Sequence, residues 1–108
     1  MGYVYFYYDK ERKVVDYVGI TQSLSRRTKE HIWYEDWVND NHIVGYIKLP
    51  DEYLCAAEYV FINELKPTRN INKRKVPPKL EGYSTDWETL LPQIKIFGND
   101  LRFADSFS

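Results

Sequence analysis

The stretch DYVGITQSLSRRTKEH, residues 16–31, runs from a strand pattern through a glycine into a basic helix pattern. Its first half belongs to VVDYVG at 14–19, an apolar, β-branched segment that predicts a strand. YVYFYY at 3–8 predicts an earlier strand, and the charged segment between the two is short enough for an antiparallel hairpin. Gly19 permits a close backbone approach where the second strand leaves the sheet.

The second half of this stretch predicts a helix that ends near residue 33. Ser23 is a suitable N-cap residue, so the helix is expected to begin beside it. Leu24, Arg27 and His31 are spaced so that they share one helix face. Because Leu24 is apolar, Arg27 is expected to face the protein interior.

Further along the chain, HIVGYIKL at 42–49 predicts a third strand, and the segment from Pro50 to about residue 65 predicts the clearest helix. Glu58 lies inside the apolar stripe of that helix. A buried carboxylate is costly unless it has a partner. The residues alone leave two partners open, a divalent cation or a core arginine such as Arg27. TDWE at 85–88 is typical of a capping box before a short helix.

Composition limits the class of protein. The chain has 108 residues, a length that supports one domain with a modest core. The formal net charge of −1 argues against coating of nucleic acid through bulk charge, but not against a local basic site. The single cysteine, Cys55, excludes an intrachain disulfide and is expected to be buried; a cytoplasmic location fits this usage. No apolar run reaches the roughly 18 residues of a membrane helix.

An ordered set of residues carries a resemblance to a known family: two tyrosine tripeptides, Tyr3 to Tyr5 and Tyr17 to Gly19, followed by Arg27, Glu58 and Asn70. In this order and on these predicted elements, the chain resembles the GIY-YIG nuclease family over roughly residues 1–74. One position departs from the family pattern, because Tyr3 replaces its first glycine. The resemblance implies an α+β fold in which a small three-stranded antiparallel sheet is flanked by helices.

The resemblance also implies a metal-dependent endonuclease that hydrolyses DNA phosphodiester bonds. Glu58 would hold one Mg²⁺ or Mn²⁺, and Arg27 would bind the phosphate. Tyr5 is expected to activate the water with His31 accepting its proton, while Tyr17 orients the water or the phosphate; exchange of the two tyrosines stays open. Activity should then rise with pH around the ordinary histidine pKa of ~6.5.

A basic segment follows Pro67 and is expected to contact the DNA backbone. Asn70 is expected to order this loop beside the site, and Asn72 could replace it if the register shifts by two. The residues predicted to bind DNA are Arg26, Lys66, Arg69, Lys73, Arg74 and Lys75.

Two other functions compete with the nuclease. One is a binding module that has a nuclease-like fold but no activity, and the other is an interaction domain in which the tyrosines only pack. Retention of Arg27, Glu58 and Asn70 together favours the enzyme.

We expect a catalytic domain over residues 1–80 and a C-terminal extension, 81–108, packed on it as part of a single domain. No DNA-reading motif is present. Specificity should therefore come from DNA structure, from a homodimer or from a separate partner, with no membrane involvement.

Overall fold

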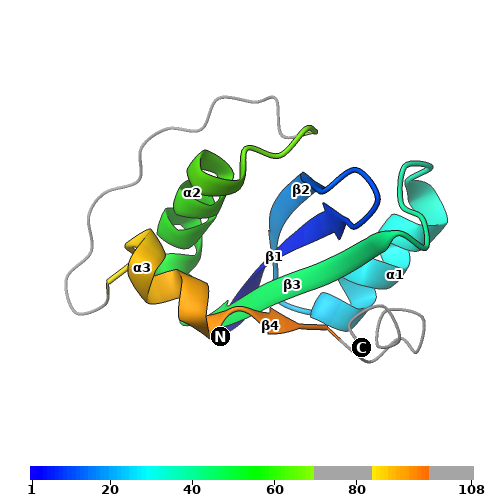
Figure 1. Ribbon diagram of the computed structural model, residues 1–108. Helices are drawn as coiled ribbons and strands as arrows, with labels where there is room; N and C mark the ends of the chain where they lie inside the picture. The colour runs from blue at the N-terminus through cyan, green and yellow to red at the C-terminus, as the bar shows by residue number, and fades with distance from the viewer. Residues whose placement is uncertain (70–83, 98–108) are drawn as a thin grey trace.

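The computed structural model describes residues 1–69 and 84–97. In these residues an antiparallel sheet with the strand order β2-β1-β3-β4 carries helices on both faces (Figure 1). The strands are β1 (Gly2–Asp9), β2 (Val14–Thr21), β3 (His42–Leu49) and β4 (Lys95–Ile96). The helices are α1 (Leu24–Tyr34), η1 (Asp51–Tyr53), α2 (Leu54–Leu65), α3 (Trp87–Leu90) and η2 (Leu91–Gln93).

The predicted α+β fold is confirmed, with one correction to the sheet. The expected three strands are present, and β4 adds a fourth at the edge beside β3. Its two residues pair with Gly45 and Tyr46. The segment was missed because two residues are too few to show the alternation of apolar and polar side chains that marks a strand.

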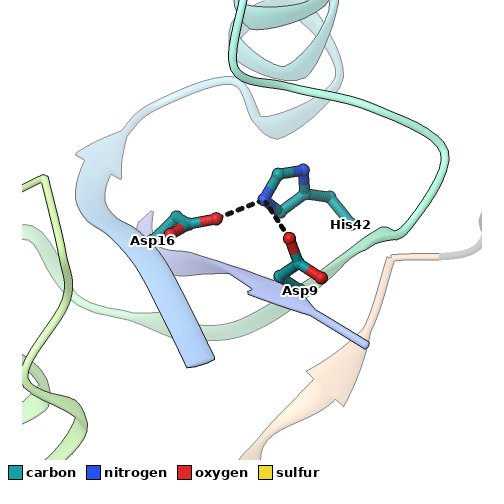
Figure 2. A group of neighbouring side chains, drawn as sticks. All are labelled: Asp9, Asp16 and His42. Atoms are coloured by element: carbon teal, nitrogen blue, oxygen red, sulfur yellow. Dashed lines mark hydrogen bonds and ion pairs between the residues drawn. The ribbon is translucent and has the colours of Figure 1, made fainter. Parts of the chain in front are cut away.

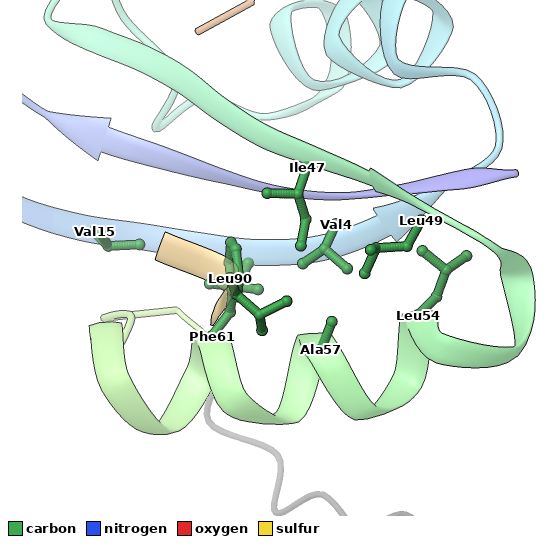
Figure 3. Close-up of a cluster of buried hydrophobic side chains, with 9 residues drawn as sticks. Val4, Val15, Ile47, Leu49, Leu54, Ala57, Phe61 and Leu90 are labelled. Atoms are coloured by element: carbon green, nitrogen blue, oxygen red, sulfur yellow. The ribbon is translucent and has the colours of Figure 1, made fainter. Parts of the chain in front are cut away.

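Alternation along β1 sends neighbouring side chains to opposite faces of the sheet. Val4 belongs to a core between the sheet and α2, which Figure 3 shows. Tyr5 belongs to a second core on the face covered by α1. Tyr5 is paired with Gly19, and Tyr7 with Tyr17, so these three tyrosines lie on the α1 face.

The predicted helix after Pro50 begins as the 3₁₀ turn η1 and continues as α2. It ends at Lys66, whose backbone adopts the left-handed conformation (φ 49°) immediately before Pro67. Leu54, Ala57 and Phe61 face the sheet. The expectation for Cys55 is wrong, because its side chain is exposed. It precedes the buried Ala56 and Ala57 and lies outside their stripe.

The segment 84–97 returns to the sheet. Leu90 enters the core beneath α2, and Phe97 enters the core on the α1 face. The predicted short helix is present as α3, but Asp86 stands at its N-cap and no side chain makes a capping hydrogen bond. In residues 1–69 and 84–97, no helix is long and apolar enough to span a membrane.

Candidate active site

The hairpin register creates space for a tyrosine above the edge strand β2. Gly19 lies opposite Tyr5 in the β1–β2 pair. A Cβ atom at Gly19 would lie 2.7 Å from Tyr5 Oη and 2.8 Å from a ring carbon of Tyr17. Any larger residue would therefore displace both tyrosines, which explains the glycine at this position.

A hydrogen-bonded group forms between β1 and α1. Tyr5 Oη lies 2.9 Å from His31 Nε2, and Arg27 Nε donates to the same oxygen over 3.3 Å. Arg27 Nη1 also donates to Glu30 over 2.9 Å. Tyr5 and His31 are buried, whereas 36% of the Arg27 side chain is exposed. The arginine can thus reach solvent while it contacts the tyrosine.

The protein environment keeps this group electrically neutral apart from Arg27. Burial, reinforced by the nearby Arg27 charge, lowers the pKa of His31 to about 4, although Glu35 and Glu30 oppose the shift. Burial and the neighbouring Tyr17 raise the pKa of Tyr5 above its ordinary value, against the effect of Arg27. The expected titration of His31 near pH 6.5 is therefore wrong, because a buried imidazole beside an arginine resists protonation.

Two aromatic rings surround the pair formed by Tyr5 and His31. The Tyr17 ring lies 6.0 Å from the Tyr5 ring and 5.1 Å from the His31 ring, and its side chain is half-buried. Trp37 lies 5.9 Å from Tyr17 and 5.8 Å from His31. No sequence pattern marks Trp37, because it lies in irregular chain after α1, where no periodicity applies.

Glu58 comes from α2, which covers the other face of the sheet from α1. It is buried in α2, on the apolar stripe that faces the sheet opposite to α1. Its side chain is 6% exposed and has an interaction within the protein. On this face α2 packs against β2, and the backbone of residues 68 and 69 lies along the outer edge of the same strand.

Three of the predicted DNA-binding residues lie in the described structure. The Arg26 side chain is 74% exposed and faces Glu30 at 3.5 Å, in contrast to the inward-facing Arg27. Lys66 and Arg69 are exposed after α2, and the Arg69 guanidinium lies 4.9 Å from the Trp37 ring centre. The other predicted residues, Asn70, Lys73, Arg74 and Lys75, and the alternative Asn72, lie outside the described residues.

A second polar cluster joins the turn end of the hairpin to the start of β3. Asp9, Asp16 and His42 are buried, and their ligand atoms lie within 4.8 Å of one another (Figure 2). His42 Nε2 lies 2.6 Å from Asp16 Oδ2 and 4.0 Å from Asp9 Oδ2. The Arg12 guanidinium donates to both carboxylates. The sequence analysis missed this cluster, although an acid between Val15 and Tyr17 in a strand was a signal.

The donor atoms of this cluster are occupied by protein groups. His42 Nδ1 accepts the Asn39 N–H at 3.2 Å, so Nε2 carries the proton and donates it to Asp16. The imidazole therefore has no free lone pair for a metal. Burial alone would raise the pKa of Asp16, but hydrogen bonds from Thr68, His42 and Arg12 lower it to about 2. Arg12 supplies the cationic charge that a metal would otherwise provide.

The same cluster holds the chain after α2 against the edge of the sheet. Thr68 Oγ1 donates to Asp16 Oδ1 at 2.5 Å. The backbone N–H groups of Thr68 and Arg69 donate to the carbonyls of Val15 and Asp16 over 3.0 and 2.9 Å. The cluster thus positions Arg69 next to Trp37 and the aromatic group.

Comparison with known proteins agrees with this arrangement. The model of the GIY-YIG catalytic domain matches residues 1–73, which include β1, β2, α1, β3 and α2. No curated protein and no solved structure shows significant similarity to the chain. The match covers more than half of the 108 residues. The chain therefore belongs to the GIY-YIG family of nucleases.

Proposed function

We propose that the protein is a metal-dependent endonuclease that hydrolyses DNA phosphodiester bonds. The observation that carries this proposal is the shared contact at Tyr5 Oη, which lies against His31 Nε2 and accepts a hydrogen bond from Arg27. A buried tyrosine that only packs needs one partner for its hydroxyl, whereas this hydroxyl contacts both an imidazole and a partly exposed guanidinium. The family membership supplies the reaction class.

Tyr5 would act as a general base through concerted proton transfer. Its raised pKa excludes a stable tyrosinate at neutral pH. Neutral His31 presents the Nε2 lone pair to Tyr5, so the tyrosine proton can pass to His31 while Tyr5 accepts the proton of the attacking water. Tyr17, half-buried beside both rings, would orient that water or the phosphate, and exchange of the two tyrosines remains an alternative.

Arg27 would bind the scissile phosphate. Its guanidinium is partly exposed, and Nη1 is held by Glu30, an exposed carboxylate that a phosphate could replace. A planar guanidinium can give two parallel hydrogen bonds to phosphate oxygens and stays charged at any relevant pH.

Glu58 fits the role of a Mg²⁺ or Mn²⁺ ligand by its chemistry. It offers carboxylate oxygens, the donor type that these ions prefer in proteins. A bound divalent ion would neutralise charge that develops on the phosphate and its leaving oxygen. The phosphate would lie where it can contact both this ion and Arg27.

Chain 66–69 would bring the DNA backbone to this edge. Lys66 and Arg69 are exposed there, and the Asp16 contacts fix their position. Arg26 projects from the exposed side of α1 and would contact a flanking phosphate. Asn70 and the basic residues 73–75 are proposed to continue this surface. The choice of DNA would depend on its structure, on a homodimer or on a separate partner.

A nicking assay on supercoiled plasmid with and without Mg²⁺ or Mn²⁺ tests the proposal. Metal-dependent conversion to open circles is expected, and Glu58→Gln should abolish it while DNA binding and the folded state persist. The competing function, a binding module with a nuclease-like fold, predicts a gel shift but no nicking at any metal concentration. Full activity of Glu58→Gln would remove this residue from the site.

A further inference from the structure

Two buried polar atoms in the described part of the chain lack a hydrogen-bond partner, and they belong to neighbouring rings. The atoms are Tyr7 Oη and His31 Nδ1. Tyr7 is fully buried, His31 is 1% exposed, and their ring centres lie 5.1 Å apart. An unsatisfied buried polar group costs about 1–3 kcal/mol, so two in contact need a physical explanation.

The proposed role of Tyr5 sets where the His31 proton lies. Tyr5 Oη accepts from Arg27 Nε, and in the proposed mechanism its own proton is donated to His31 Nε2. An imidazole that accepts at Nε2 and is neutral must carry its proton on Nδ1. His31 Nδ1 is therefore a donor in a buried position, and the Tyr7 hydroxyl beside it can accept or donate.

We propose that Tyr7 is a positioning residue for His31 and that one buried water molecule joins His31 Nδ1 to Tyr7 Oη. The water accepts a hydrogen bond from the N–H group at His31 Nδ1 and donates a hydrogen bond to Tyr7 Oη. Two hydrogen bonds of about 2.8 Å each satisfy both atoms where no direct bond forms. This arrangement holds the tautomer in which Nε2 faces Tyr5, so the inference rests on the proposed function of that pair.

The arrangement also stabilises His31 after it accepts the proton of Tyr5. Both ring nitrogens of the imidazolium are donors, and the water keeps an acceptor at Nδ1. Arg27 disfavours the cation, while Glu30 and Glu35 favour it. Electrostatic interactions with Tyr5, Arg27 and Tyr17 influence the pKa of Tyr7, so its hydroxyl lies within the electric field of the same site. The titratable and charged groups that surround His31 are Tyr5, Tyr7, Tyr17, Arg27, Glu30 and Glu35.

Tyr7→Phe removes only the hydroxyl and tests the inference. Its matched control is Tyr8→Phe, because Tyr8 is the next residue of β1 and packs against the core on the opposite face. In the wild type, the ¹⁵N signals of the His31 ring should show a protonated Nδ1 and an unprotonated Nε2. Tyr7→Phe should shift these signals toward a mixture of tautomers and lower kcat at pH 7 by about 3–10-fold with unchanged KM, the value of one hydrogen bond.

Tyr8→Phe should leave both the ring signals and kcat at the wild-type values. The inference is overturned if Tyr7→Phe has the His31 signals and kcat of the wild type, or if both tyrosine variants change them equally. Failure of the proposed function has a different signature. The wild type would then cut no DNA under any condition, while the nitrogen signals would still show whether removal of the Tyr7 hydroxyl changes the His31 tautomer.

Discussion

His31 and His42 are both buried, and Trp37 contacts both rings, yet the two imidazoles differ in their hydrogen bonds. His42 has hydrogen bonds at both nitrogens, with Asn39 and with Asp16. His31 has a bond only at Nε2, to a tyrosine that also contacts Arg27. The two histidines thus share burial but differ in their partners. In the proposed mechanism His31 differs from His42 because its Nε2 faces the hydroxyl of Tyr5.

The largest expected effect separates the two histidines by activity. His31→Ala should lower kcat by about 10²–10⁴-fold, the usual contribution of general-base assistance, because Tyr5 loses its proton acceptor. Single-turnover plasmid nicking at saturating Mg²⁺ measures it. His42→Ala, assayed well below its melting temperature, should keep kcat within about tenfold of wild type, a limit that the 10² effect exceeds. Equal losses in both variants would contradict the assignment of distinct roles.

The second prediction concerns the stability that the cluster around His42 provides through Asp16, its hydrogen-bond partner. Asp16→Ala removes a buried carboxylate that holds Arg12, His42 and Thr68, so the free energy of unfolding should fall by about 3–5 kcal/mol. Urea denaturation followed by circular dichroism measures the change. The control is Asp51→Ala, whose exposed ion pair with the N-terminus should be worth less than about 1 kcal/mol.

Thermal denaturation with and without added metal tests whether the cluster of Asp9, Asp16 and His42 binds an ion. Because Asp16 and His42 are already paired, Zn²⁺ or Mn²⁺ should not raise the melting temperature of Glu58→Gln. A metal-dependent increase in that variant, abolished by adding His42→Ala, would show that Asp9, Asp16 and His42 bind an ion.

The third prediction uses pH. The pKa of His31 falls from an ordinary 6.5 to about 4 on folding, so the unfolded state binds more protons between these values. Stability should therefore decrease as pH falls from about 6.5 to 4, by at most about 3 kcal/mol. His31→Gln should remove this dependence. Asp16, with its pKa lowered to about 2, should contribute a separate loss between about pH 4 and 2.

The pH dependence of the cleavage rate tests the same pKa of His31. With the pKa of the imidazole near 4, its Nε2 lone pair is available throughout the neutral range, and the rate should show no ionisation of His31 near pH 6.5. A rate profile from pH 5 to 9 checks this. A clear inflection at 6.5 that disappears in His31→Ala would show that the bound DNA or metal restores an ordinary pKa.

The smallest expected effect belongs to Arg26, and its neighbour Arg27 provides the contrast. Arg26 is exposed and pairs with Glu30 over 3.5 Å. Arg26→Ala should therefore raise KM a few-fold and reduce the salt dependence of DNA binding. Arg27→Lys should be nearly inactive, because an ammonium cannot provide two parallel contacts to a phosphate. Fluorescence anisotropy at several salt concentrations and the nicking assay measure these effects. Greater sensitivity at Arg26 would contradict the orientation of α1.

The sequence by itself determined the framework and much of the candidate site. The aromatic and β-branched residues of YVYFYY and VVDYVG predicted the hairpin, and helical spacing placed Arg27 and His31 on one inward face. The ordered residues from Tyr5 to Asn70 gave the family. These features are local, because periodicity and fixed spacing follow from backbone geometry alone. β4 escaped prediction because its pairing is set by β3 and not by its own two residues.

Only the tertiary structure decided the chemistry of the individual groups. An ordinary pKa of ~6.5 was expected for His31 from the sequence. Burial beside Arg27 lowered the pKa of His31, while hydrogen bonds with Asn39 and Asp16 fixed the tautomer of His42. The place of Glu58, on the other face of the sheet, likewise follows from how α2 packs against β2. Desolvation and hydrogen bonding depend on residues far apart in the chain, and no local pattern encodes them.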